Sequence, residues 1–214
     1  GGVLVNKDLM NNFGKAGGNV GTVMDFTSAS LNTGFLAMAA ELDLCDINEM
    51  AKRLGVSYGD GSDITKDKYD EAGNQIEAAN APYASVLGSK NVSPMAMAGA
   101  YATVANGGKY CQPTAIDSIT GPNGEAIEPP KTTCEQVISP EVAATAAHAL
   151  QRVMSSGTGT PSNTWDGTPL IGKTGTDDSF HTAMVESSSK VATAVWVGNY
   201  RDRVSLWNNS VNGV

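Results

Sequence analysis

The chain has 214 residues, of which 41% are hydrophobic and 17% are charged, a composition typical of one globular domain with a sizeable core. Its formal net charge is -8 with only 14 Lys and Arg residues, so a nucleic-acid backbone is not expected as a partner. No apolar run is long enough to span a bilayer, and no His or Cys spacing indicates a metal site or another cofactor.

The first predicted helix follows a turn at Ser30. Its evidence is a set of apolar residues three or four positions apart, namely Leu31, Phe35, Met38 and Leu42. Asn32 or Thr33 is expected to cap its start. Ser30 therefore lies at the junction between the turn and the helix.

Three further helices are predicted from their end signals. Asp46 and Glu49 have the spacing of a capping box, and we expect that short helix to end at Gly55. Ser93-Pro94 and Ser139-Pro140 each combine an N-cap residue with a proline at the first helical position. The helices that they open should stop at an Asn-Gly-Gly and a Ser-Ser-Gly sequence.

The remaining segments are predicted to be loops and strands. Residues 57–85 form a long polar connection, and GPNGEAIEPP, within residues 110–136, is typical of a small hairpin. After residue 165 come three runs rich in β-formers, LIGKTGT, HTAMVES and KVATAVWVGN. They predict an antiparallel meander after a mostly helical body, which is an α+β arrangement.

The three cysteines have different expected roles. Cys45 ends an apolar run and is expected to be buried. Cys111 and Cys134 flank the loop-rich excursion without a nearby His or third Cys, which favours a disulfide and an oxidising compartment. Two unpaired thiols remain the alternative, because the sequence does not give their separation.

GTPLIGKTGTDD, residues 167–178, matches the phosphate-loop pattern through Gly167, Gly172, Lys173 and Thr174. A phosphate loop requires a helix directly after it, so that loop amides and the helix N-terminus converge on the phosphates. Here two aspartates and strand-like runs follow instead. The sequence therefore does not favour a nucleotide site.

The same letters contain Lys173-Thr174-Gly175-Thr176, a motif of serine acyl-transfer enzymes. On a strand, Lys173 and Gly175 face one side while Thr174 and Thr176 face the other. Gly175 would let a ligand backbone approach closely. The threonine hydroxyls can donate to a substrate carboxylate, and the Thr176 amide to a developing oxyanion.

Ser30-Leu31-Asn32 supplies a second element, a Ser-x-Asn pattern. The same pattern occurs at residues 89–91 and 210–212. Only the first match lies at a helix entry well before the Lys-Thr-Gly-Thr motif. Simple helix capping remains the alternative role of Ser30 and Asn32.

The chain resembles the transpeptidase domain of a class A (bifunctional) penicillin-binding protein. The segments that carry the resemblance are, in chain order, SASLNTGF, SPMAMAGAYATVANGGKYCQP, SSGTGT, GKTGT and AVWVGN. The Cys-bearing loop is similar to that of actinobacterial members. The resemblance implies an antiparallel sheet flanked by helices, the penicillin-binding protein/β-lactamase-like serine transpeptidase fold. It also implies a peptidoglycan D,D-transpeptidase that acts on D-Ala-D-Ala stem peptides, is acylated by β-lactams, and works in the cell-wall space. A membrane would be reached only through an anchor outside this chain.

The resemblance also implies roles for the motif residues. Ser30 would relay protons between a catalytic lysine and the leaving amine, and Asn32 would hold the amide of the donor peptide. Lys173 would set the electrostatics beside the cleft, although strict alternation turns it away from the hydroxyls. Thr174 and Thr176, with Gly175 between them, would bind the terminal carboxylate. The strand HTAMVES lacks the Trp that the family commonly has, and its connection is shorter.

The nucleophile of such a domain is the serine of a Ser-x-x-Lys motif that precedes Ser-x-Asn. No residues before Ser30 match this motif. Ser187–Lys190 has the right residue types, but it lies in a predicted turn, whereas the motif needs one helical turn to bring the lysine beside the serine. We therefore expect residues 1–214 to be the C-terminal part of the domain, inactive without a complementary polypeptide that carries this motif. Two further strands and a C-terminal helix are also implied. Alternative functions are a D,D-carboxypeptidase, a β-lactamase-like hydrolase and an inert β-lactam-binding sensor.

Several residues of types common in active sites are interpreted as structural. His148 lies within a predicted helix and His181 at the start of a predicted strand, and both are expected to support the fold. Asp177 and Asp178 are typical turn formers. Packing roles are expected for Trp165, Trp196 and Trp207.

Overall fold

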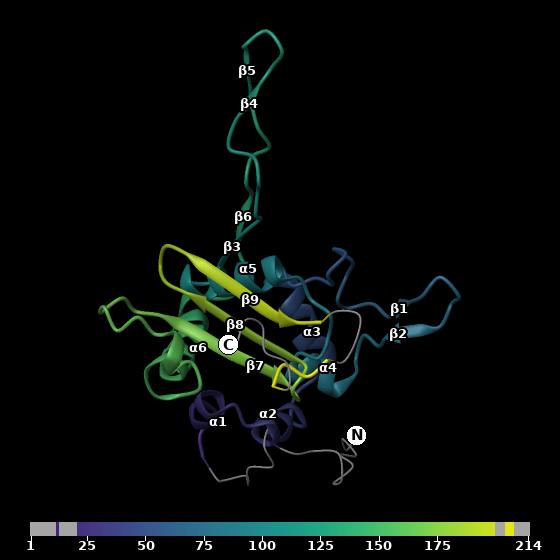
Figure 1. Cartoon of the computed structure of the whole chain (residues 1–214), viewed down its shortest axis with the longest axis vertical. Helices are drawn as coiled ribbons and strands as arrows, with labels where there is room; N and C mark the ends of the chain where they lie inside the picture. Colours follow the sequence, from purple (N-terminus) through teal and green to yellow (C-terminus); the bar gives the residue numbers. More distant parts are fainter. Residues whose placement is uncertain (1–11, 13–20, 200–203, 208–214) are drawn as a thin grey trace.

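The computed structural model describes residues 12, 21–199 and 204–207 (Figure 1). Its helices are α1 Val23–Ala29, α2 Asn32–Ala39, α3 Leu44–Arg53, α4 Pro82–Leu87, α5 Pro94–Ala105 and α6 Pro140–Ser156, with a 3-10 turn η2 Thr160–Ser162. Its strands are β1 Lys68–Tyr69, β2 Gln75–Glu77, β3 Lys109–Cys111, β4 Ile119–Thr120, β5 Ala126–Ile127, β6 Cys134–Gln136, β7 Ile171–Asp177, β8 His181–Ser187 and β9 Ala192–Gly198. The mixture of helices and antiparallel strands confirms the predicted α+β class.

The central sheet has the order β7-β8-β9, and both pairings are antiparallel. The three strands are the three predicted β runs, so the meander is confirmed. β7 continues to Asp177 with no helix at Thr174. This geometry excludes a phosphate loop, which needs a helix at that point.

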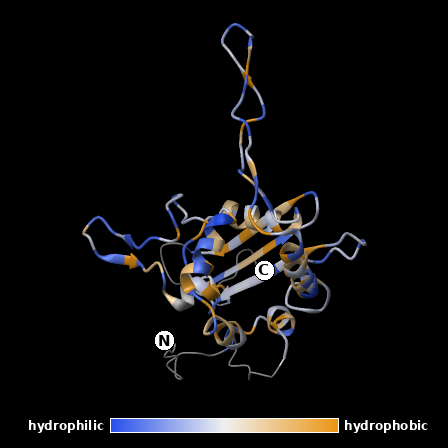
Figure 2. Cartoon of the chain, turned by 180° about the vertical axis from the view of Figure 1, so that it is seen from behind, coloured by the Kyte–Doolittle hydropathy of each residue, from blue (hydrophilic) through white to orange (hydrophobic). Residues whose placement is uncertain are grey.

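Helices α5 and α6 pack against the sheet, α5 on β8 and β9 and α6 on β7, while α1 packs on α6. The core between them includes Val153 and Met154 of α6, Ile171 of β7 and Val185 of β8, all buried. Apolar residues are prominent in this layer, whereas the protruding loops are more mixed (Figure 2). The site described below lies at the edge of the sheet, at β7.

The helix starts predicted at Ser93 and Ser139 are confirmed, and the start predicted at Asp46 is wrong. Ser93 and Ser139 cap α5 and α6 by accepting hydrogen bonds from backbone amides three residues on. α3 begins earlier than predicted because Asp43, rather than Asp46, caps it through a 2.7 Å bond from the amide of Cys45. Gly55 follows the helix end with φ 85°, as a left-handed C-terminal glycine should.

The segment around α2 differs most from prediction. The N-cap is Leu31 without a side-chain cap bond, so neither Asn32 nor Thr33 caps the helix. The cap comes from Asn12, whose Oδ1 accepts from the Thr33 amide at 3.1 Å. Leu42 lies beyond the helix and is 53% exposed, because the chain turns after Ala39.

Two other features near this segment were not predicted correctly. α1 was not predicted at all, although Thr22 and Asp25 form a complete capping box at its start. Cys45 was expected to be buried but is exposed on the first turn of α3. Its apolar neighbours belong to a turn and a helix start, so they do not continue one buried face.

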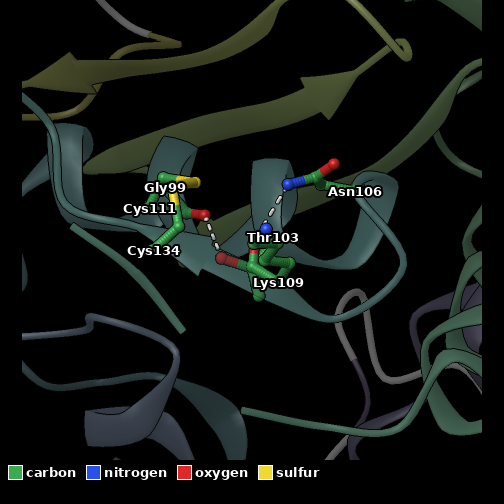
Figure 3. Close-up of a disulfide and its surroundings, with 6 residues drawn as sticks. All are labelled: Gly99, Thr103, Asn106, Lys109, Cys111 and Cys134. Carbon is green, nitrogen blue, oxygen red and sulfur yellow. Dashed lines mark hydrogen bonds between the residues drawn. A yellow bond between two sulfur atoms is a disulfide. The ribbon is translucent and has the colours of Figure 1, made fainter. Parts of the chain in front are cut away.

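Residues 109–136, which we call the finger, extend away from the sheet at the end of the molecule opposite α1 and α2 (Figure 1). β4 and β5 form the hairpin that the sequence predicts, and β3 pairs with β6 at the base. There Cys111 and Cys134 are direct cross-strand partners and form a disulfide with a Cα–Cα distance of 4.1 Å. Figure 3 shows it next to the part of α5 that carries Gly99 and Thr103.

The polar connection contains more structure than predicted, including the β1–β2 hairpin and α4. Lys90 organises it: this side chain is only 5% exposed and donates to the carbonyl oxygens of Ile64 at 2.8 Å and Ala79 at 2.7 Å. The Ser89–Asn91 pattern therefore surrounds a lysine that is part of the local core, which indicates a structural segment.

Candidate active site

The site begins with the turn at Ser30. Ser30 ends α1 with φ 54° and ψ 48°, in the left-handed region that few serines adopt, and its amide bonds back to Phe26 and Thr27. Gly34 of α2 lies so near the Phe26 ring that a Cβ there would be 2.4 Å from it. The two short helices are therefore closely packed, and they fix Ser30 at a tight junction.

Lys173 of β7 joins this junction. Its Nζ donates to Ser30 Oγ at 2.6 Å and to the carbonyl oxygen of Thr174 at 2.8 Å, although Ser30 and Lys173 are 143 residues apart in the chain. Burial lowers the pKa of Lys173 from 10.5 to about 8. The amine can consequently exchange a proton with its surroundings near neutral pH while it remains bonded to the serine.

A second contact links β7 to the loop after α6. Thr174 Oγ1 and Thr158 Oγ1 are 2.6 Å apart. Thr158 is itself fixed, because its amide donates to the Ser28 carbonyl at 3.0 Å. A Cβ at Gly157 would lie 2.4 Å from that same carbonyl oxygen, so only glycine allows this approach.

Sequence reasoning did not select Thr158 as a site residue. The one sequence feature that points to Thr158 is its place in the SSGTGT segment, which is part of the family resemblance. No spacing rule pairs its threonine with Thr174, because the contact depends on how α6 ends against α1. The structure places the Thr158 hydroxyl beside the motif all the same.

The rest of the Lys-Thr-Gly-Thr motif is open to solvent. Gly175 and Thr176 are exposed and pair with Ala183 and Thr182 of β8. A Cβ added to Gly175 would meet only Ala183, at an ordinary 3.8 Å, so packing within the described residues does not require glycine here. β7 is also an edge strand of the described sheet. A ligand backbone can therefore run along it.

Asn32 is half-buried on the first turn of α2, two residues after Ser30. It thus belongs to the same junction as Ser30. Residues 210–212, another Ser-x-Asn match, lie outside the described residues. Ser187–Lys190 forms the turn between β8 and β9, not a helical turn, so it does not have the geometry of a Ser-x-x-Lys nucleophile.

Within residues 12, 21–199 and 204–207 no group of three His, Cys, Asp or Glu side chains is placed to bind a metal ion. No helix in that part of the chain is long and apolar enough to cross a bilayer. The site itself presents the Ser30, Thr158 and Thr174 hydroxyls, the Lys173 amine and backbone amides on an edge strand.

Comparison with known families matches residues 3–203 to "Penicillin binding protein transpeptidase domain". The chain is 35% identical to penicillin-binding protein 1A of Aquifex aeolicus over 131 residues, which is 60% of this chain and 18% of that protein. It is 26% identical to penicillin-binding protein 1A of Mycolicibacterium smegmatis over 206 residues, which is 90% of this chain and 25% of that protein.

Solved structures show the same fold. Penicillin-binding protein A of M. tuberculosis, determined as an imipenem acyl-enzyme complex, matches with a TM-score of 0.70 and 25% identity, covering 91% of this chain and 47% of that one. PonA1 of M. tuberculosis matches with a TM-score of 0.74 and 21% identity, covering 95% and 55%. The chain thus spans about half of these structures and about a fifth to a quarter of the curated relatives.

Proposed function

Because this chain belongs to the penicillin-binding protein transpeptidase family, we propose that it forms the carboxylate-binding and proton-relay part of a peptidoglycan D,D-transpeptidase site. The 2.6 Å bond between Lys173 Nζ and Ser30 Oγ carries the proposal. It joins, across 143 residues, the two motif segments that acyl transfer requires in one cleft.

Thr174 and Thr176 bind the terminal carboxylate of the donor stem peptide, D-Ala-D-Ala. Thr176 is exposed, and the hydroxyl of Thr174 is held by Thr158 at 2.6 Å. Two hydroxyl donors beside a partly charged Lys173 suit an anion, because hydrogen bonds to a charged group are about twice as strong as neutral ones. A β-lactam carries its carboxylate in the same relation to the reactive carbonyl, so it binds here too.

Ser30 transfers the proton that the leaving group needs. Lys173 donates to Ser30 Oγ, which leaves the hydroxyl proton of Ser30 free to be donated to the nitrogen of the departing D-Ala. The nucleophilic serine forms the acyl bond as the scissile C–N bond breaks, and the nitrogen gains the Ser30 proton. Ser30 regains the proton that the nucleophilic serine gives up, passed on by the lysine of the Ser-x-x-Lys motif, while Lys173 stays protonated beside it. Asn32, at the same junction, holds the amide of the donor peptide.

The nucleophile is supplied by a serine of a Ser-x-x-Lys segment outside residues 1–214. Val195 and Val197 of β9 support a complementary segment, because they lie on one face of the sheet and are 50% and 49% exposed. Half-exposed valines side by side favour burial against another element. A folded, monomeric species of 22.1 kDa that reacts with penicillin by itself would refute this part of the proposal.

The disulfide between Cys111 and Cys134 supports a location on the extracytoplasmic side of the cell membrane. Disulfides persist in oxidising compartments, and peptidoglycan is cross-linked outside the membrane. The relatives named above carry the names of penicillin-binding proteins, which agrees with this location.

The test is acylation of the full-length protein by a fluorescent penicillin, followed by product analysis with a stem pentapeptide and an amine acceptor. We expect covalent labelling, release of D-Ala and a cross-linked product. Release of D-Ala without cross-linking would indicate a carboxypeptidase. Rapid loss of the penicillin label would indicate a β-lactamase. Stable labelling without any peptide turnover would indicate a sensor.

A further inference from the structure

Thr182 of β8 donates a hydrogen bond to the backbone of the Lys-Thr-Gly-Thr motif. Its Oγ1 lies 3.2 Å from the carbonyl oxygen of Gly175. The register of the sheet places Thr182 directly opposite Thr176, the residue that follows Gly175. A side chain of the neighbouring strand is therefore bonded to the motif at the peptide group that joins Gly175 to Thr176.

This bond indicates which way the backbone groups of β7 point. Successive residues of a strand direct their N–H and carbonyl groups to opposite edges of that strand. The Gly175 carbonyl meets Thr182 and is therefore directed to β8, so the N–H and carbonyl of Thr176 are directed to the free edge. By the same alternation the Thr174 carbonyl, which accepts from Lys173 Nζ at 2.8 Å, also belongs to the free edge. The Thr176 amide thus points away from β8, to the side of the strand that a ligand can reach.

The Gly175 carbonyl and the Thr176 N–H are the two ends of one planar peptide group. A bond that holds the carbonyl end therefore also fixes the direction of the N–H. Gly175 constrains this group little by itself, because glycine has a wide range of backbone angles and a Cβ there would meet only Ala183, at 3.8 Å. A hydrogen bond to the carbonyl also polarises the amide, which makes its N–H a stronger donor. Thr182 thus orients and strengthens the Thr176 amide from the opposite side of β7.

We propose that Thr182 is a positioning residue for the oxyanion donor of the transpeptidase site. The proposal rests on the function proposed above and on the Thr176 amide as the donor to the oxyanion. When the nucleophilic serine adds to the scissile carbonyl, that oxygen gains negative charge, and a donor that is already oriented stabilises it without reorganisation. Thr182 acts through the Thr176 amide and does not touch the substrate. Its loss should therefore slow acylation without weakening the binding of the substrate carboxylate.

The experiment separates the binding of a fluorescent penicillin from the acylation step in the full-length protein. Stopped-flow kinetics over a range of penicillin concentrations give the dissociation constant of the non-covalent complex and the first-order rate of acylation. Thr182 is exposed, so Thr182→Val, which keeps the branched shape, should not disturb the fold. We expect about a fivefold lower acylation rate in this variant, the scale of one lost hydrogen bond. The dissociation constant should stay within about twofold of wild type.

Thr193→Val is the matched control. Thr193 of β9 is exposed on the same face of the sheet as Thr182, and its side chain makes no hydrogen bond within the described part of the chain. This variant should react like wild type, and Thr182→Ser, which keeps a hydroxyl, should retain the acylation rate within about twofold.

Four results would overturn the proposal: a wild-type acylation rate in Thr182→Val, a loss confined to the dissociation constant, an equal loss in Thr193→Val, or a Thr182→Ser variant as slow as Thr182→Val. A loss confined to the dissociation constant would mean that Thr182 contacts the substrate itself. Failure of the wild-type protein to react with penicillin would instead refute the proposed function on which this inference rests.

Discussion

The site at β7 and the finger are held together in opposite ways. The site depends on contacts between distant parts of the chain, such as Lys173 to Ser30 and Thr158 to Ser28. The finger depends on pairing between near neighbours and on one disulfide that spans 23 residues. Single substitutions in the site at β7 should therefore change the chemistry, whereas large changes in the finger should not.

Lys173→Ala should have the largest effect. It removes the buried amine that donates to Ser30 Oγ and that, in the proposed mechanism, attracts the substrate carboxylate. We expect the rate of acylation by penicillin in the full-length protein to fall by about 10³-fold, as for loss of a preorganised electrostatic group. Lys190→Ala, in the exposed β8–β9 turn, is the control and should react like wild type. A loss below tenfold would contradict the role of Lys173.

Ser30→Gly should come next, with a loss of about 10²-fold in acylation rate, the scale of a single proton-transfer group. Glycine keeps the left-handed turn at φ 54°, so the variant tests the hydroxyl without straining the backbone. Thermal unfolding should confirm that the fold is intact. Wild-type rates in this variant would mean that Ser30 serves only to end α1.

The rate of acylation should also depend on pH through Lys173. Burial lowers its pKa to about 8, so the ammonium that donates to Ser30 is present below pH 8 and is lost as pH rises through that value. We expect about a tenfold fall in rate between pH 7 and pH 9. A profile that keeps rising through pH 9 would show that the neutral amine is the active form.

Thr158→Val should have a smaller effect, because it removes one hydroxyl contact to Thr174 and preserves the shape of the side chain. A loss of about 1 kcal/mol corresponds to roughly fivefold weaker capture of penicillin, measured as the second-order acylation rate. Thr160→Val, in the 3-10 turn that follows, provides a comparison variant and should not show this loss.

Changes in the finger should have the smallest effect on catalysis. Cys111→Ser together with Cys134→Ser removes the disulfide, which should cost the finger up to about 3 kcal/mol of local stability. Proteolysis within residues 112–133 should become faster, while acylation stays within about twofold of wild type. A tenfold loss of acylation would show that the finger and the site at β7 are coupled.

The sequence predicts those parts of the molecule that depend on local signals. The three strands, the finger hairpin and the caps at Ser93 and Ser139 follow from alternation, turn residues and capping chemistry. The start of α2 was predicted wrongly because its cap comes from Asn12, about twenty residues away. That bond cannot be inferred from neighbouring residues.

The same distinction applies to the site. The motif residues were identified from sequence, but the 2.6 Å contacts of Lys173 with Ser30 and of Thr174 with Thr158 depend on tertiary packing. The lowered pKa of Lys173 is also a consequence of burial, which motif spacing does not give. Thr182 looks like an ordinary strand residue until the register places it opposite Thr176.

The most direct test of the proposed active site is a crystal structure of the full-length protein acylated by penicillin. The proposed mechanism predicts that the drug carboxylate lies within about 3 Å of the hydroxyls of Thr174 and Thr176, with Ser30 and Lys173 still bonded beside the acylated serine. A drug bound covalently with its carboxylate away from β7, or with Ser30 and Lys173 apart, would contradict it.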